Sequence, residues 1–174
     1  EPGGELDYCC NSDVSYTIRG VHTQLSAVWR WEAPAGAGDT HLAVYRGTKA
    51  AIEVRQGAEE NYRPELYVVT ADPGVKEALQ KRIRALAERY AGLELEDQGR
   101  RIRVLIPDLY HVGHEAHFAQ VARAFFDYLK RPETFPAWED PNMLAKYYTT
   151  TTGMELSRGE KPRANPADPS ARAT

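Results

Sequence analysis

The chain has 174 residues, 42% of them hydrophobic, and its formal net charge at pH 7 is −3. This length and composition suit one domain with its own hydrophobic core. The small negative charge offers no electrostatic attraction for nucleic acid or for an anionic membrane, so neither is an expected partner. No apolar run approaches the roughly 18 residues that a membrane-spanning helix needs.

The beginning of the chain favours a piece of a longer, cytoplasmic protein. Its first residues, EPGGELDYCC, contain neither an initiator Met nor the basic and apolar segments of a signal peptide. The two cysteines, Cys9 and Cys10, are neighbours, and such Cα atoms lie about 3.8 Å apart, below the usual range for a disulfide. We therefore expect no disulfide framework, as is typical of a reducing compartment.

Residues 12–32 alternate between two kinds of side chain and predict two antiparallel strands with a break at Gly20. The apolar face contains Val14, Tyr16, Ile18, Val21, Thr23, Leu25, Ala27, Trp29 and Trp31, and the mainly polar face contains Ser15, Thr17, Arg19, His22, Gln24, Ser26, Val28, Arg30 and Glu32. This pattern is typical of a sheet that is covered on one side only.

The next segment predicts three more strands, over residues 41–46, 50–56 and 65–70. A helix then begins at Asp72-Pro73, because Asp is a good N-cap residue and Pro fits the first turn. The apolar stripe of this helix runs as far as Tyr90, and Gly92 is its expected end.

The last third of the chain predicts a hairpin and two helices. The hairpin covers residues 93–106, with its turn at Gln98-Gly99. One helix is expected over residues 114–130 and another over residues 142–157, with a proline-rich linker between them. The final residues lack apolar periodicity and are expected to be disordered.

This order of elements indicates the α+β class. We expect a mainly antiparallel, open-faced sheet with helices packed on one face, which makes a two-layer sandwich. Residues 1–132 are expected to form this open-sheet domain, residues 133–158 a linker and a C-terminal helix that pack on it, and residues 159–174 the disordered tail.

The polar face of the sheet contains the residues expected to bind a small molecule. A histidine such as His22 can act as a general base near neutral pH, and Arg30 can hold a carboxylate or a sugar oxygen. Gln24 lies on the same predicted face, and His41 and Arg46 flank the next strand and could extend the surface. The alternative interpretation is that this face is simply solvated or forms an interface with another protein.

Three histidines, His111, His114 and His117, raise the alternative of a zinc-dependent hydrolase. A zinc protease helix places its histidines four residues apart, whereas these are spaced by three, and the N-terminus of a helix repels a cation. We expect no metal site. The sequence also lacks a dinucleotide fingerprint and a nucleophile motif, so it shows no set of catalytic residues and no cofactor site of its own.

Four segments resemble the C-terminal domain of Gfo/Idh/MocA-family oxidoreductases, and most closely the oxidoreductase C-terminal domain subgroup. These segments are WRWEAPAGAGDTH (29–41), RGTKAAIEVRQGAE (46–59), HEAHFAQVARAFFDYL (114–129) and NMLAKYYTTTTGMELSR (142–158). The resemblance implies a parent protein whose N-terminal Rossmann domain binds NAD or NADP and carries a catalytic Lys. It further implies that the open sheet face lines a pocket for sugars, inositols or polyols and mediates oligomer contacts.

Two hypotheses follow from the residues and this resemblance. In the first, the chain is the substrate-binding and oligomerisation domain of an NAD(P)-dependent oxidoreductase, with its Rossmann domain missing and with His22, Gln24, Arg30, His41 and Arg46 on the substrate side. Such a fragment is expected to bind no NAD(P) and to be inactive by itself. In the second, the chain is a non-catalytic interaction module that self-associates through its bare sheet face.

Overall fold

The computed structural model describes residues 2–4, 10–29 and 32–162. It divides the chain into two compact units. The end unit joins Glu1–Trp31 to Val121–Thr174, and the middle unit is Glu32–Gln120. Strands and helices occur together in this structure, with the strands antiparallel, so the predicted α+β class is confirmed.

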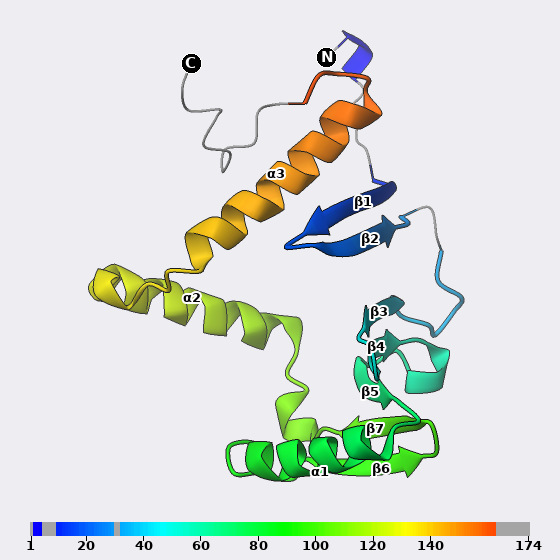
Figure 1. The fold of residues 1–174 in the computed structure, drawn as a ribbon. Helices are drawn as coiled ribbons and strands as arrows, with labels where there is room; N and C mark the ends of the chain where they lie inside the picture. Colours follow the sequence, from blue (N-terminus) through cyan, green and yellow to red (C-terminus); the bar gives the residue numbers. More distant parts are fainter. Residues whose placement is uncertain (1, 5–9, 30–31, 163–174) are drawn as a thin grey trace. The chain divides into compact units, whose positions relative to one another are not determined.

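The end unit contains a hairpin of β1 (Ser12–Ile18) and β2 (Val21–Ala27) (Figure 1). Its two turn residues, Arg19 and Gly20, have φ angles of 48° and 79°, as a type I′ hairpin turn requires. The register confirms the two predicted faces. The pairs Val14–Leu25, Tyr16–Thr23 and Ile18–Val21 share one face, and Ser15–Gln24 and Thr17–His22 share the other.

Within the described residues, this hairpin forms a two-stranded sheet of its own, although we expected one sheet for the whole chain. The described residues after β2 include Pro34 and Gly36, whose φ is 81°, and they form a turn in place of a further strand. Backbone of this kind cannot continue a strand ladder.

The helices of the end unit are α3 (Glu139–Ser157) and the second half of α2 (His114–Lys130), which crosses the boundary between the units. Helix α3 begins three residues before the predicted position, because Pro141 is accommodated in its first turn. Gly153 of α3 lies against the apolar face of the hairpin, since a Cβ there would be 3.8 Å from the methyl groups of Val14.

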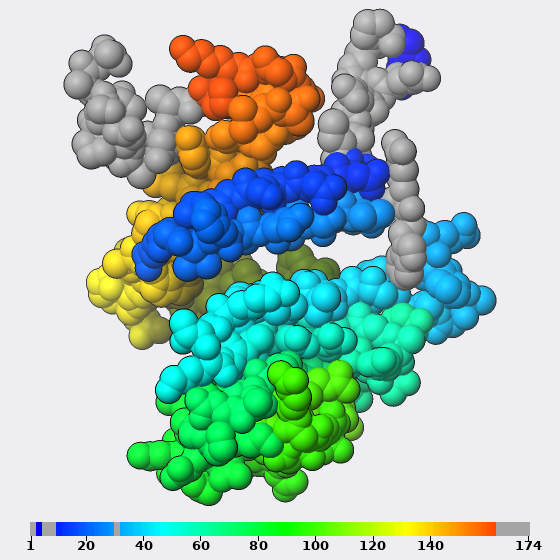
Figure 2. Space-filling model, turned by 45° about the vertical axis from the view of Figure 1, so that its right-hand side comes forward, coloured from blue at the N-terminus to red at the C-terminus, as the bar shows by residue number. Residues whose placement is uncertain are grey.

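The middle unit is built on a five-stranded antiparallel sheet with the strand order β3-β4-β5-β7-β6. The strands are β3 (His41–Arg46), β4 (Ala51–Gln56), β5 (Glu65–Val69), β6 (Glu94–Gln98) and β7 (Arg101–Leu105). Helix α1 (Pro73–Ala87) connects β5 to β6 and lies against β6 (Figure 1). The strand β3, in cyan in Figure 2, is an edge strand and lies at the surface.

The two faces of this sheet differ in chemistry. The register pairs Leu66 with Val104 and Val68 with Ile102, and the side chains of three of these residues are buried with Ile83 of α1. The opposite face is charged, because the alternate residues of the same strands include Glu65, Tyr67 and Arg103. A sheet with one apolar and one charged face is what the alternating sequence predicts.

We expect Ile102→Ala to lower the free energy of unfolding by about 2–5 kcal/mol, because the substitution leaves a cavity in the core. Ile102 is only 3% exposed and lies in the central part of the apolar face. Urea denaturation followed by circular dichroism measures the change. The control is Leu109→Ala, at a position that is 66% exposed, where the change should stay within about 0.5 kcal/mol. Equal losses in both variants would contradict this assignment of the core.

Candidate functional site

A polar cavity of about 280 Å³ lies on the charged side of the five-stranded sheet. Tyr67 of β5 and Arg103 of β7 line it from the sheet, and they are direct cross-strand neighbours. The short 3-10 helix Ala58–Glu60, which follows β4, contributes Glu60. Two strands and a loop that are distant in sequence therefore bring carboxylate, phenol and guanidinium groups into one cavity.

Glu60 is a buried carboxylate, only 8% exposed, that is held by uncharged donors. Its Oε2 accepts a hydrogen bond from the backbone N–H of Gly57 at 3.1 Å, and its Oε1 accepts one from the Tyr67 hydroxyl at 3.3 Å. No ion pair joins it to any cation among the described residues. A buried charge is costly unless it is well hydrogen-bonded, so Glu60 has a strong tendency to accept further donors.

Glu65, by contrast, forms an ion pair with both of its carboxylate oxygens. Arg103 donates to it through Nη2 at 2.8 Å and through Nε at 3.2 Å, in the bidentate geometry that suits a guanidinium and a carboxylate. The hydrogen bond from Arg103 to Glu65 raises the pKa of Arg103 despite the opposing effect of burial. This pair fixes the position of the Arg103 guanidinium at the floor of the polar cavity.

Tyr67 is 5% exposed, and the pKa of its hydroxyl is raised above the ordinary value. Burial is the largest cause that raises the pKa of Tyr67, and the nearby charge of Glu60 raises it further. The Arg101 guanidinium lies over the ring, 4.7 Å from its centroid. Tyr67 is therefore a fixed hydrogen-bond donor between the sheet and Glu60.

A second cavity of about 660 Å³ adjoins the first, and Arg63, Ile106 and Asp108 line both. The Arg63 Nη2 atom lies 2.7 Å from Asp108 Oδ1, and this contact lowers the pKa of the Asp108 carboxyl. The further walls of the adjoining cavity are largely apolar or aromatic, and they include Tyr62 and Tyr110.

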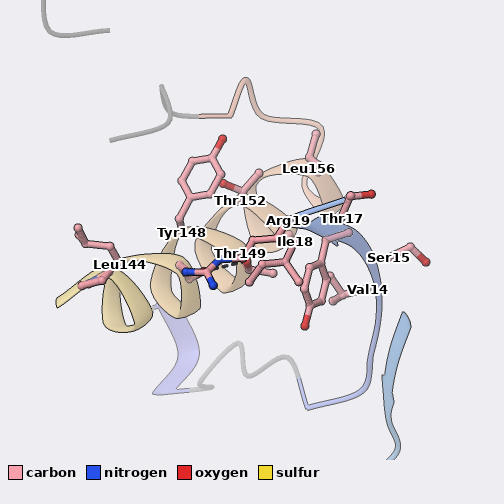
Figure 3. Close-up of a pocket in the computed structure, with 14 residues that line it drawn as sticks. Val14, Ser15, Thr17, Ile18, Arg19, Leu144, Tyr148, Thr149, Thr152 and Leu156 are labelled. Carbon is pink, nitrogen blue, oxygen red and sulfur yellow. Dashed lines mark hydrogen bonds between the residues drawn. The ribbon is translucent and has the colours of Figure 1, made fainter. Parts of the chain in front are cut away.

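The end unit has a hollow of about 550 Å³ between β1 and α3 (Figure 3). Its labelled walls combine the aliphatic side chains of Val14, Ile18, Leu144 and Leu156 with the polar side chains of Ser15, Thr17, Arg19, Tyr148, Thr149 and Thr152. The Oγ1 atom of Thr152 is buried and has no hydrogen-bond partner among the described residues. The polar cavity of the middle unit combines carboxylate, phenol and guanidinium groups, so it is the better candidate for a hydroxylated ligand.

Residues 3–158 match the family described as "Putative oxidoreductase C terminal domain". The chain belongs to this family. It is also similar to a solved structure titled as that of a putative oxidoreductase from Parabacteroides merdae ATCC 43184, with 42% sequence identity and a TM-score of 0.80. That likeness covers 86% of this chain and 35% of the other, so this oxidoreductase C-terminal domain spans about a third of that protein. No curated protein matches it.

Of the site residues predicted from the sequence, His22, Gln24, His41 and Arg46 line none of the three cavities described above. His22 and Gln24 share one exposed face of β2, where His22 Nδ1 is 3.0 Å from Thr17 Oγ1. His41 and Arg46 stand at opposite ends of β3, and their separation of five residues places them on opposite faces of the strand. Arg30 lies outside the described residues. Of the four that the structure describes, only His22 and Gln24 come together on one face of one strand.

The residues of the polar cavity were missed because no single segment reveals them. Residues 53–55, 65–67 and 101–103 do alternate charged and apolar side chains, and this signal predicts a charged face. The cross-strand register, which sets Tyr67 beside Arg103, depends on how the strands pair and is not visible in any one strand.

The histidines do not form a metal site. Among the described residues, no group of three side chains of the ligand type is arranged to hold an ion. His111 Nε2 lies 3.2 Å from the backbone oxygen of Ile106, and the His114 ring meets the edge of Phe118 at 4.7 Å. No helix in the described part of the chain is long and apolar enough to cross a membrane.

We expect the pKa of Tyr67 to make stability depend on alkaline pH. The pKa of Tyr67 is raised in the folded state, so its hydroxyl ionises first in the unfolded chain. The contribution of Tyr67 to the free energy of unfolding is therefore fully present below about pH 10 and is lost as the pH rises through the folded-state pKa. Tyr67→Phe should remove this part of the dependence. The check is a comparison of urea midpoints between neutral and alkaline pH, with tyrosinate absorbance recorded in parallel. An unchanged pH dependence in the variant would refute the assignment.

Proposed function

We propose that this oxidoreductase C-terminal domain is the substrate-side part of an NAD(P)-dependent enzyme of the wider Gfo/Idh/MocA group. In this proposal the polar cavity of the middle unit binds a sugar or a polyol. The nucleotide is held by a part of the protein outside this chain, in keeping with the 35% of the similar Parabacteroides protein that the chain covers.

The observation that carries the proposal is the buried Glu60 carboxylate, which has hydrogen-bond donors but no ion pair among the described residues. A polyol presents several hydroxyl groups that can donate to Glu60 and accept from Arg63 and Asn61, which line the same cavity. The volume of about 280 Å³ is near the lower end of the range for small-molecule sites, about 300–1,000 Å³. A small, hydroxyl-rich ligand matches both the size and the chemistry.

In this proposal the dinucleotide does not bind to the helices of this chain. A pyrophosphate commonly binds to free backbone N–H groups at the N-terminus of a helix. At α1 the carboxylate of Asp72 already accepts the Gly74 N–H at 2.8 Å, and acidic residues, Glu115 and Glu139, occupy the first turns of α2 and α3. These negative charges repel a phosphate, so we assign no step of hydride transfer to this chain. In this proposal the chain binds and orients the substrate, and correct orientation alone can substantially lower the activation barrier of a reaction.

Self-association is the second candidate function, and a separate observation favours it. Tyr45 and Ile52 pair across β3 and β4 on the apolar face, yet Tyr45 is 65% exposed and Ile52 is 46% exposed. A second copy of the chain would cover them in a homo-oligomer. The surface predicted from the sequence, with His22, Gln24, Arg30, His41 and Arg46, remains a further proposal for contact with the substrate or with a partner copy.

We expect the 174-residue chain to bind glucose or myo-inositol weakly, with NMR shifts confined to residues 57–67 and 101–108. Glu60→Gln should weaken binding about tenfold or more, because a hydrogen bond to a charged group is worth about 1.5–3 kcal/mol. The matched control is Glu94→Gln, an exposed carboxylate on β6 that lines no cavity described above. Shifts clustered on the β1–β2 hairpin would favour His22 and Gln24 in place of the polar cavity. Reduction of NAD or NADP by the chain alone would refute the placement of the nucleotide elsewhere.

For the second candidate, Tyr45→Lys with Ile52→Lys should lower the molar mass measured by analytical ultracentrifugation, because two charges would be buried in the interface. Polyol binding should be unaffected, since neither residue lines the polar cavity. Glu77→Lys, at an exposed position of α1, controls for the added charge, because this single substitution changes the net charge by as much as the two substitutions together. A chain that is monomeric before substitution contradicts self-association through this patch.

A further inference from the structure

We infer that the substrate is a glycoside, with its first sugar ring in the polar cavity and its second ring in the adjoining cavity of about 660 Å³. The inference rests on the proposed function and extends it from a single sugar or polyol to a two-ring ligand. Both cavities belong to the middle unit.

The two cavities share one wall. Arg63, Ile106 and Asp108 line both of them, and the ion pair of Arg63 with Asp108 is exposed to solvent. A molecule that extends from one cavity into the other passes along this pair. There a glycosidic oxygen or a ring hydroxyl can accept from the guanidinium or donate to the carboxylate.

The adjoining cavity has the chemistry of a ring site. Tyr62 and Tyr110 offer aromatic surface, and sites for small molecules are typically lined by apolar and aromatic side chains with a few polar groups. Tyr110 is held in place, because its ring meets Tyr90 edge-on with centroids 5.7 Å apart and its hydroxyl donates to the Ala91 oxygen at 3.4 Å. The apolar C–H face of a sugar ring, or an aromatic aglycone, would pack on such a surface.

The backbone between the two cavities has an unusual conformation at two consecutive residues. Asn61 and Tyr62 are consecutive residues with φ angles of 52° and 58°, in the left-handed region. Asn tolerates this conformation, whereas Tyr adopts it rarely because its Cβ lies too close to the backbone there. With the backbone in this conformation, Asn61 lines the polar cavity and Tyr62 lines the adjoining one. Unusual backbone of this kind concentrates at functional sites.

The packing around Tyr62 supports the same role. A Cβ at Gly38 would lie 3.2 Å from the Cβ of Tyr62, so a glycine at this position leaves room for the Tyr62 side chain. The left-handed turn and the glycine are separate features of the sequence, and both act on the placement of this one ring.

A neutral ring suits the adjoining cavity better than a phosphate. Its one guanidinium, on Arg63, is already paired with Asp108, and His111 Nε2 lies 3.2 Å from the Ile106 oxygen. A phosphate would therefore meet an unfavourable carboxylate at Asp108 and no uncommitted guanidinium. A glycoside adds no charge.

The test compares monosaccharides with their phenyl glycosides and with disaccharides, by calorimetric titration of the 174-residue chain. We expect at least one glycoside to bind about tenfold more tightly than its parent monosaccharide, which corresponds to about 1.4 kcal/mol.

Tyr62→Gly should remove this gain and leave monosaccharide affinity unchanged. Because Gly relieves the left-handed strain, the variant should fold at least as stably as the original chain. The control is Tyr147→Ala, at an exposed position of α3 that lines none of the cavities described above, and this variant should keep the gain.

Two outcomes would overturn the inference, and only the second would also contradict the proposed function. If monosaccharides bind but glycosides gain nothing, or if the gain survives Tyr62→Gly, the two-ring substrate is wrong and the proposed function stands. If no sugar of either kind binds, the proposed role of the polar cavity fails and the inference fails with it.

Discussion

The pairing of β5 with β7 places Val68 beside Ile102 on one face of the sheet and Tyr67 beside Arg103 on the other. Because side chains alternate along a strand, this single register supplies both the core of the middle unit and the floor of its polar cavity. A slip of one residue would exchange the two sets and bury the charges under α1. The stability of the apolar face therefore fixes the geometry of the charged one.

Two carboxylates on the charged side of this sheet have different roles. Glu65 is neutralised by the bidentate contact from Arg103, so it holds the sheet face together and has little left to offer a ligand. Glu60 is buried to a similar degree, but among the described residues its hydrogen bonds come from the Tyr67 hydroxyl and a backbone N–H, and no ion pair reaches it. Of the two carboxylates, Glu60 therefore has the greater remaining capacity to accept a hydrogen bond.

The two units of the chain differ in what they offer. The middle unit combines a sheet core with polar and aromatic cavities that share the ion pair of Arg63 with Asp108. The end unit offers an apolar groove along α3 and a small hairpin. The chain belongs to the oxidoreductase C-terminal domain family, and its polar cavity lies on the charged face of the middle unit's sheet.

The sequence by itself determined the elements of this protein. Alternation predicted every strand and the two faces of the hairpin, and the apolar stripes with Asp72-Pro73 predicted the helices to within a few residues. These features are local, since a strand or helix period and a capping residue act over a few positions. The resemblance of four segments to known oxidoreductases also indicated the family that the comparison with known proteins then showed.

Only the tertiary structure decided which residues meet. His41 and Arg46 flank one strand in the sequence, but an odd separation puts them on opposite faces. Glu60 joins Tyr67 because a left-handed turn follows the 3-10 helix, and Tyr67 joins Arg103 because β7 inserts between β5 and β6. Strand order and register are set by long-range packing of the apolar face, so a local pattern can reveal a charged face without showing which of its charges form a site.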